Sequence, residues 1–231
     1  NERGHVQFDW LDTYHSFSFG QYHDPTKIHF GALRVLNDDK VDAGMGFGTH
    51  PHDNMEIITI PLFGDLHHRD STGRDCIIKE HDVQIMSAGS GIQHSEVNPN
   101  KDKRVELFQI WIFPKERNIT PRYDQKSFLP EDRVDQLLTV VSPNEPGTLF
   151  INQDAWLSLG HFKKPFTTNY PMHQAGQGLF AICVEGTCTV GGQILGRRDA
   201  VGISGVEAVQ IEATAGSDLL LIEIPHFTTG A

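Results

Sequence analysis

Four residues of types that bind metal ions lie in two short segments of the chain, "GTHPHD" and "GIQHSE". The first segment contains His50 and His52, and the second contains His94 and Glu96. Residues i and i+2 of an extended strand point to the same face, so each segment would present a same-face pair. If the two strands are neighbours in a curled sheet, three imidazole nitrogens and one carboxylate oxygen converge. Such a mixture suits iron, manganese, nickel, copper, cobalt or zinc better than a thiolate site would.

An octahedral ion held by these four ligands would keep two positions open, where a substrate and dioxygen could meet.

The spacing alone is weak evidence, because a histidine followed two residues later by His, Asp or Glu also occurs about this often by chance. The pattern begins at His50, His68 and His94. We expect His67, His68 and Asp70, which follow a turn at Gly64, to be exposed to solvent.

The elements that must position these residues are predicted to be β-strands. Short β-branched and aromatic runs such as "MEIITIPLFG", "RVELFQIWIF" and "SDLLLIEIP" alternate with Gly, Pro, Asn and Asp, which is typical of a sandwich or barrel. Helical periodicity is scarce. The segment 113–133, "FPKERNITPRYDQKSFLPEDR", has three prolines, many charges and no clear period. We interpret it as a linker between two halves.

The two halves are predicted to be copies of one structural unit. Shifting residues 199–213 back by 117 positions places them on residues 82–96, so that His94 falls on Ile211 and Glu96 on Ala213. Aligning the turn glycines Gly64 and Gly186 instead places His50 on Met172 and His52 on Gln174. The second half is therefore expected to lack every candidate ligand.

Glycines frame both candidate segments in a recognisable way. The first reads Gly44-x5-His50-x-His52-x3-Glu56 and the second Gly91-x2-His94-x3-Asn98, which resembles the two cupin motifs. Further text resembles the pirin family of bicupins: "DWLDTYHSFSFGQYHDP" (9–25), "GFGTHPH" (46–52), "MSAGSGIQHSE" (86–96) and "LFQIWI" (107–112). The resemblance is strong over residues 9–125 and weak beyond them. Gly89 stands where the second cupin motif usually has proline.

The resemblance implies an all-β bicupin with two double-stranded β-helix barrels. We expect residues 1–120 to form a metal-binding cupin domain and residues 121–231 a cupin domain without metal ligands. In pirin-like proteins the residues matching His50, His52, His94 and Glu96 hold one metal ion, usually taken to be Fe(II). Glu56 matches a motif glutamate that is not a ligand. It is expected either to orient an imidazole by a hydrogen bond or to be a solvated strand end.

Two functions compete. Pirin-like bicupins are associated with opening the flavonol quercetin by O2 with loss of carbon monoxide, and Glu96 would then be the general base that takes the 3-hydroxyl proton. The alternative is a non-catalytic, metal-dependent regulator that docks on a transcription factor, as the resemblance to eukaryotic pirin implies. A sugar isomerase is a third class, for which the sequence offers no recognisable polar sugar pocket.

Composition limits the other partners. The formal net charge of −11 argues against direct binding to nucleic acid or an anionic membrane surface, although a protein partner remains open. No apolar run approaches the roughly 18 residues of a membrane span. Three cysteines without a C-x-x-C pair indicate a reducing compartment, and we expect a cytoplasmic location. Because the sequence begins at Asn1, a removed leader is left open.

Overall fold

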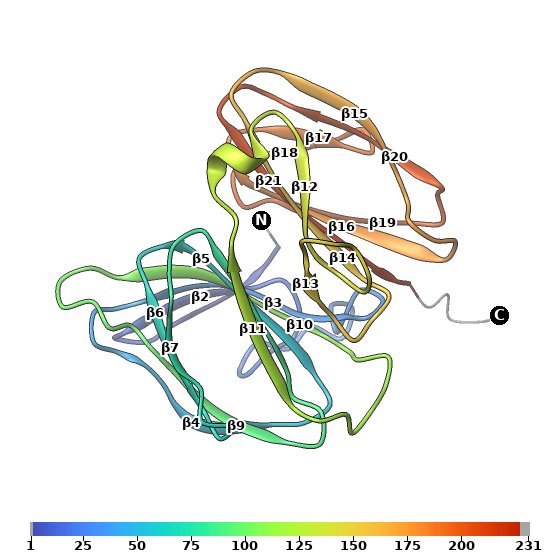
Figure 1. Cartoon of the computed structure of the whole chain (residues 1–231). Coiled ribbons are helices and arrows are strands. Elements are labelled where there is room, and N and C mark those ends of the chain that lie inside the picture. The colour runs from blue at the N-terminus through green and yellow to red at the C-terminus, as the bar shows by residue number, and fades with distance from the viewer. Residues whose placement is uncertain (1, 227–231) are drawn as a thin grey trace.

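The regular structure of the chain consists of β-strands arranged in two lobes (Figure 1). The structure is a computed structural model that describes residues 2–226. Within that range the one helix is a short 3-10 segment, η1 (Pro130–Arg133), and no described helix is long and apolar enough to cross a membrane. The all-β prediction is therefore confirmed.

The N-terminal lobe consists of two facing sheets. The larger sheet has the strand order β1-β2-β3-β10-β5-β8-β11, and the smaller has the order β4-β9-β6-β7. The strands are β1 (Gly4–Gln7), β2 (Leu11–His15), β3 (Leu33–Val41), β4 (Gly46–His52), β5 (Glu56–Phe63), β6 (Leu66–Asp70), β7 (Asp75–Ile78), β8 (Asp82–Ser87), β9 (Ile92–Val97), β10 (Val105–Ile112) and β11 (Arg122–Ser127).

The C-terminal lobe also consists of two sheets, with the orders β13-β12-β14-β21-β16-β19 and β15-β20-β17-β18. Its strands are β12 (Leu137–Ser142), β13 (Leu149–Phe150), β14 (Trp156–Phe162), β15 (Phe166–Pro171), β16 (Gln177–Glu185), β17 (Cys188–Val190), β18 (Gln193–Leu195), β19 (Ala200–Ser204), β20 (Ala208–Ala213) and β21 (Ser217–Pro225).

The two lobes repeat one strand order. The central order β3-β10-β5-β8 of the first lobe corresponds to β14-β21-β16-β19 of the second, and β4-β9-β6-β7 corresponds to β15-β20-β17-β18. The predicted internal repeat and the bicupin fold are thus confirmed. Each lobe is a pair of facing sheets rather than one continuously hydrogen-bonded barrel.

The larger sheets of the two lobes pack against each other and share one apolar core. Ile58 and Ile60 of β5 belong to this shared core, together with Leu157 and Ile222 from the second lobe. The alternate residue Ile57 belongs to a separate cluster inside the first lobe. Because β5 is buried on both faces, its sequence is a continuous apolar run rather than an alternating one.

The segment 113–133 contains a strand that the sequence did not reveal. β11 pairs antiparallel with β8, from Arg122 opposite Ser87 to Ser127 opposite Asp82. The interpretation of the whole segment as a linker is therefore wrong, because residues 122–127 form an edge of the larger N-terminal sheet. The division of the chain into domains at residue 120 stays a prediction.

Pro61 is accommodated within β5 because the pairing changes around it. β5 pairs with β8 only from Glu56 to Thr59, and the register with β10 shifts between Glu106 and Leu107, opposite the proline. A proline cannot donate a ladder hydrogen bond, so it is tolerated where pairing ends or where a bulge occurs.

Candidate metal centre

The antiparallel pairing of β4 with β9 brings the predicted histidines together. His50 lies opposite His94, and His52 lies opposite Ile92, after a register shift between Phe47 and His50. Since His50 and His52 are two residues apart on one strand, both rings point to the face on which His94 lies. Two segments separated by some forty residues thereby present three imidazoles on one surface of the smaller sheet.

The three imidazole rings surround one point. Ring centroids are 4.5 Å apart for His50 and His94, and 4.8 Å apart for His52 with either of the other two. One nitrogen from each ring lies within 4.8 Å of the others. This is a grouping that three histidines binding one ion require, because each metal–nitrogen bond is only about 2.0–2.1 Å long.

Glu96 is buried below these rings and is held by two side chains of the larger sheet. The Gln109 amide donates to Glu96 Oε2 at 2.8 Å, and the Thr59 hydroxyl lies 3.2 Å from Oε1. A carboxylate oxygen of Glu96 lies within 4.8 Å of nitrogens of His94 and His68, which makes a second group of potential ligands. The four predicted residues thus fall in two overlapping groups that share His94.

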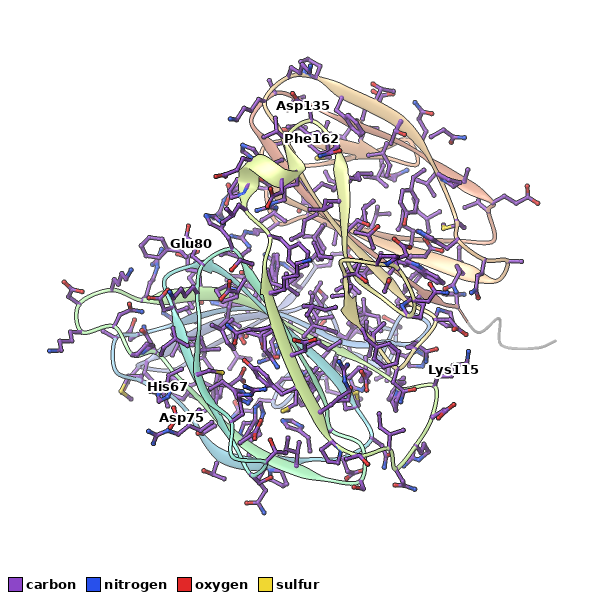
Figure 2. The ribbon with its side chains drawn as sticks, in the orientation of Figure 1. His67, Asp75, Glu80, Lys115, Asp135 and Phe162 are labelled. Carbon is purple, nitrogen blue, oxygen red and sulfur yellow. The ribbon has the colours of Figure 1, made fainter. Side chains whose placement is uncertain are left out.

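His68 is not exposed, contrary to the sequence-based expectation. Its side chain is fully buried, and its Nε2 lies 3.0 Å from Asp70 Oδ2, which is also buried. β6 pairs with β9 so that His68 lies opposite Glu96, which turns the ring towards the centre. The alternate residue His67 points outward and pairs with Asp75 at 2.6 Å (Figure 2). The alternation along β6 separates His67 from His68, but it does not say which of the two faces inward.

Burial holds two of the three imidazoles in the neutral form that binds metals. Burial, reinforced by His50 and His68, lowers the pKa of His94 to about 3. Burial, reinforced by His94 and His50, lowers the pKa of His52 to about 4. His50 Nδ1 lies 2.7 Å from the Gly48 carbonyl, which as acceptor requires a proton on Nδ1, so Nε2 is the nitrogen through which this ring would bind a metal.

Both ring nitrogens of His94 are buried without a hydrogen-bond partner among the described residues. A buried polar atom without a partner costs about 1–3 kcal/mol, so such atoms are rare unless a ligand satisfies them. Three imidazoles, two of them held neutral by burial, with a buried carboxylate beside them fit a divalent first-row transition ion. The donor set therefore matches the metal that the sequence implies.

Aromatic side chains form a wall beside the histidines. The Trp111 ring meets His52 edge-on at 4.9 Å, and Phe19 meets Trp111 at 5.3 Å in a T-shaped contact. Trp111 lies two residues after Gln109 on β10 and therefore shares its face. A flat aromatic molecule beside the centre would find an apolar surface here. Phe19 belongs to the "DWLDTYHSFSFGQYHDP" segment that resembles the pirin family.

Glu56 lies on the other face of the larger sheet. Its side chain is buried, and its Oε2 accepts hydrogen bonds from the Ser87 hydroxyl at 2.8 Å and the Asn152 backbone amide at 3.2 Å. Burial raises its pKa to about 7. The structure thus gives Glu56 partners in the shared core instead of an imidazole or solvent, because Glu56 alternates with the inward-facing Ile57.

The corresponding positions of the C-terminal lobe differ from those that the glycine alignment indicated. β15 pairs with β20 so that Thr168 lies opposite Ile211 and Tyr170 opposite Val209. Thr168 and Tyr170, rather than Met172 and Gln174, therefore correspond to His50 and His52. The two potential metal-ligand groups found among the described residues both lie in the N-terminal lobe. A metal-free C-terminal lobe stays a prediction.

Comparisons with known proteins place this site in a family. The Pirin family matches residues 1–112, and a family described as the quercetinase C-terminal cupin domain matches residues 139–224. A protein named Quercetin 2,3-dioxygenase from Escherichia coli (strain K12) is 42% identical over 228 residues, which are 97% of this chain and 96% of that protein. The chain belongs to the pirin family. A Pirin-like protein of Caulobacter vibrioides is 36% identical over 95% of both chains.

Solved pirin structures share the whole architecture. The bacterial pirin YhhW from Escherichia coli, in complex with nickel(II), matches with a TM-score of 0.92 and 40% identity over 98% of this chain and 96% of that one. Another structure of YhhW matches with a TM-score of 0.93 and 41% identity, covering 99% of this chain and 97% of that one. The weak resemblance of residues beyond 125 therefore understates the similarity, because the pirin bicupin fold extends over both lobes.

Proposed function

We propose that this pirin-family protein is a metal-dependent dioxygenase that cleaves flavonols such as quercetin with O2 and releases carbon monoxide. The observation that carries the proposal is the convergence of three imidazoles beside a buried carboxylate, with both nitrogens of His94 buried and without protein partners. The name of the 42% identical relative from Escherichia coli supports the substrate and the reaction. The proposed location is the cytoplasm, which the free cysteines Cys76, Cys183 and Cys188 favour.

We assign one divalent ion to His50, His52, His94 and Glu96. Fe(II) is our first choice, since the family resemblance implies it, and manganese, nickel, copper, cobalt and zinc suit the same donors. The nickel(II) complex of YhhW supports a divalent transition metal as the ion that this chain binds. When bound, the ion supplies Lewis acidity and a template that brings substrate oxygen and O2 together.

The side chains around the ion have separate roles in proton transfer and substrate binding. Glu96 takes the proton of the flavonol 3-hydroxyl, which leaves an electron-rich flavonolate ready to react with oxygen. Gln109 and Thr59 hold the carboxylate in place, so that little reorganisation accompanies proton transfer. Trp111 and Phe19 give the flat substrate an apolar surface beside the histidines and keep water from that side.

The decisive experiment combines metal analysis with product detection. Protein purified without chelator is analysed for metal, and separate samples are reconstituted with Fe(II), Mn(II), Ni(II), Cu(II) and Co(II). Each is mixed with quercetin in air, while the decay of quercetin absorbance and the release of carbon monoxide are followed. We expect carbon monoxide to equal the quercetin consumed with at least one metal. Stoichiometric metal without carbon monoxide for any ion would reject the enzyme and favour the regulator of a transcription factor.

A further inference from the structure

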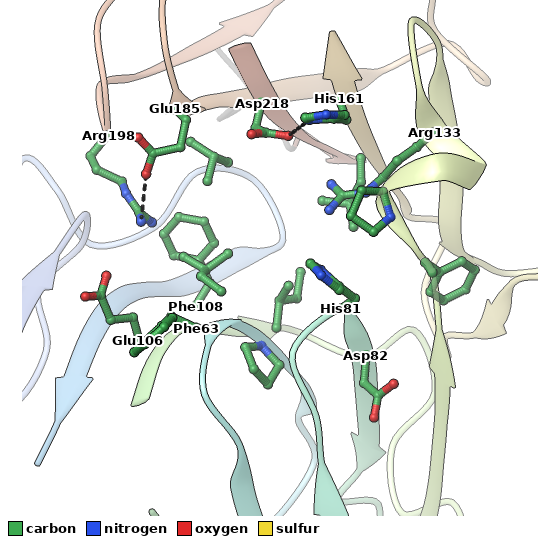
Figure 3. A pocket seen from close by; sticks show the side chains of 17 residues that line it. Phe63, His81, Asp82, Glu106, Phe108, Arg133, His161, Glu185, Arg198 and Asp218 are labelled. Carbon is green, nitrogen blue, oxygen red and sulfur yellow. Dashed lines mark hydrogen bonds and ion pairs between the residues drawn. The ribbon is translucent and has the colours of Figure 1, made fainter. Parts of the chain in front are cut away.

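A cavity of about 440 Å³ lies between the two lobes, apart from the histidine cluster (Figure 3). The N-terminal lobe contributes β5, β10 and the turn before β8, and the C-terminal lobe contributes η1 with parts of β14, β16 and β21. Cavities of 300–1,000 Å³ at domain boundaries commonly bind small molecules. We refer to this cavity as the interlobe cleft.

The larger N-terminal sheet separates the interlobe cleft from the candidate metal centre. Ile60 and Phe108 face each other across β5 and β10, and both line the cleft. The preceding residue of β5, Thr59, and the following residue of β10, Gln109, point the opposite way and contact Glu96. A molecule in the cleft would therefore lie on the reverse side of the sheet from the substrate of the proposed reaction.

The carboxylates that line the interlobe cleft already have partners. Asp218 lies 2.8 Å from His161 Nδ1, and Asp82 accepts the Lys79 backbone amide at 2.9 Å. The remaining two are Glu185, paired with Arg197 at 2.8 Å, and Glu106, paired with Arg104 at 2.6 Å. Two of these four carboxylates are thus paired with arginines, whereas Asp82 and Asp218 have partners that are not arginine or lysine side chains.

Arg133 of η1 is the exception among the charged groups of the interlobe cleft. Its guanidinium makes no hydrogen bond or ion pair with any residue that the structure describes, and its Nε is buried without a partner. Burial lowers the pKa of Arg133, while nearby Asp218 opposes this effect. Since arginine stays charged in proteins, this half-buried cation lacks a direct counter-ion.

Two nitrogen-bearing rings lie at the same end of the cleft as Arg133. Figure 3 shows His81 and His161 beside Arg133 at one end, whereas Arg198 and Glu185 lie at the other. His81 adopts a φ of 72°, which is a strained, left-handed conformation for a residue with a side chain. The backbone there is held because the His81 carbonyl accepts a hydrogen bond from Phe128 at 2.9 Å.

Arg198 closes the other end and also occupies a strained backbone position. Its φ is 66°, and its buried guanidinium lies over the Phe108 ring at 5.1 Å. It reaches Asp38 at 3.5 Å and Glu185 at 3.6 Å, so it contacts both lobes. Strained non-glycine residues of this kind concentrate at functional sites. Two of them in one cleft point to a role for the cavity beyond packing.

We propose that the interlobe cleft binds a small organic anion, namely a carboxylate carried on an aromatic or branched apolar body. The carboxylate pairs with the Arg133 guanidinium, which can offer two parallel N–H donors, and His81 lies at the same end. The apolar body packs on Ile60, Leu62 and Phe108, which line the same cavity. This site is independent of the proposed flavonol reaction.

The test is calorimetric titration of the full, metal-loaded chain with 2-naphthoate and, separately, with the uncharged 2-naphthamide. We expect one equivalent of naphthoate to bind, and naphthamide to bind at least tenfold more weakly. Arg133→Met should weaken naphthoate binding at least tenfold, because it keeps an unbranched apolar side chain and removes the charge and the N–H donors. Arg117→Met, which removes an exposed arginine outside the cleft, should leave the affinity unchanged.

Two further variants locate the bound anion. A carboxylate can also bind a metal ion, so the His50→Ala, His94→Ala double variant is titrated as well, and it should bind naphthoate like the parent chain. Leu62→Trp, which fills the cleft without changing charge, should weaken binding at least tenfold. The proposal is overturned if no saturable binding occurs at millimolar naphthoate. Unchanged binding by Arg133→Met, or loss of binding in the double variant, overturns it equally.

Discussion

His94 belongs to both groups of potential ligands, so it is the residue on which the candidate metal centre depends most. We expect the His50→Ala, His94→Ala double variant to lose its bound metal and to remain folded. The buried His94 nitrogens have no protein partner, so the only side-chain hydrogen bond that the described part of the metal-free protein loses is the local one from His50 Nδ1 to the Gly48 carbonyl. Metal content by elemental analysis and thermal unfolding of chelated samples check both parts. One equivalent of metal retained by the variant would refute the ligand assignment.

Glu96 is the residue that should separate metal binding from turnover. Glu96→Gln keeps the size of the side chain and one oxygen that can still accept a hydrogen bond, but an amide cannot take a proton at neutral pH. We expect the variant to retain part of its metal and to release carbon monoxide at least about 100-fold more slowly, the usual range for loss of a general base. Full activity would leave the enzyme intact and reject this role for the carboxylate.

At the residue scale, the local sequence identified candidate metal ligands where their spacing and the flanking glycines both matched a motif. His50, His52, His94 and Glu96 were chosen from the sequence, and the structure gathers them around one end of the N-terminal lobe. His68 was missed because its burial depends on its position opposite Glu96, 28 positions along the chain. Such long-range register is not encoded in the neighbouring residues.

At the element scale, the close approach of β4 to β9 should control the geometry of the histidines. A Cβ atom at Gly46 would lie 2.2 Å from the Glu96 carbonyl oxygen and 2.6 Å from Val97 Cα. Both are backbone atoms of β9, which cannot move aside as the end of a flexible side chain could. Gly46→Ala should therefore push β4 away from β9 and lower metal affinity at least about tenfold, because a misplacement of roughly 1 Å is enough to disturb a preorganised site.

Gly48 provides a matched control on the same strand. A Cβ atom there meets no atom within 4 Å, so Gly48→Ala should keep the metal affinity of the parent chain. Competition with a chromogenic chelator measures both affinities, and the thermal midpoint reports the strand pairing. Equal affinities for the two variants would show that the spacing of β4 and β9 does not position the ligands.

Strands were predictable where the apolar runs were long. They were less predictable where a strand forms only because a neighbouring strand pairs with it. β5 and β10 follow from their β-branched and aromatic runs. β11 has the polar sequence "RYDQKS" and forms because β8 offers it an open edge. The alignment of the turn glycines failed for a similar reason, whereas the shift by 117 positions agrees with the strand pairing. The turn glycines indicated Met172, whereas strand pairing makes Thr168 the counterpart of His50.

At the scale of the whole molecule, the two lobes share one apolar core. This core explains why the sequence could predict two repeated halves but not the surface through which they contact each other. Ile58, Ile110, Leu157 and Ile222 come from central strands of the two larger sheets. An apolar run that is buried on both faces does not say which face meets the other lobe. The interlobe cleft and the buried environment of Glu56 both depend on this contact between the lobes. Neither could therefore be predicted from the sequence.

Glu56 should make the contact between the lobes sensitive to pH. Burial raises its pKa to about 7, while the Ser87 hydroxyl and the Asn152 backbone amide oppose that rise. An acid with a raised pKa binds more protons in the folded state than in the unfolded state. Its contribution to stability is therefore complete below its unfolded pKa of about 4.3 and is lost as pH rises towards 7, by up to roughly 3 kcal/mol.

Glu56→Gln removes this titration and keeps an oxygen for the Asn152 amide. We expect the variant to lose less stability than the parent chain between pH 5 and pH 8 in urea unfolding, whereas the exposed Glu131→Gln should follow the parent. An equal loss in parent and Glu56→Gln would show that Glu56 does not change its protonation in the folded protein over this range, and the pH dependence would then belong to other groups.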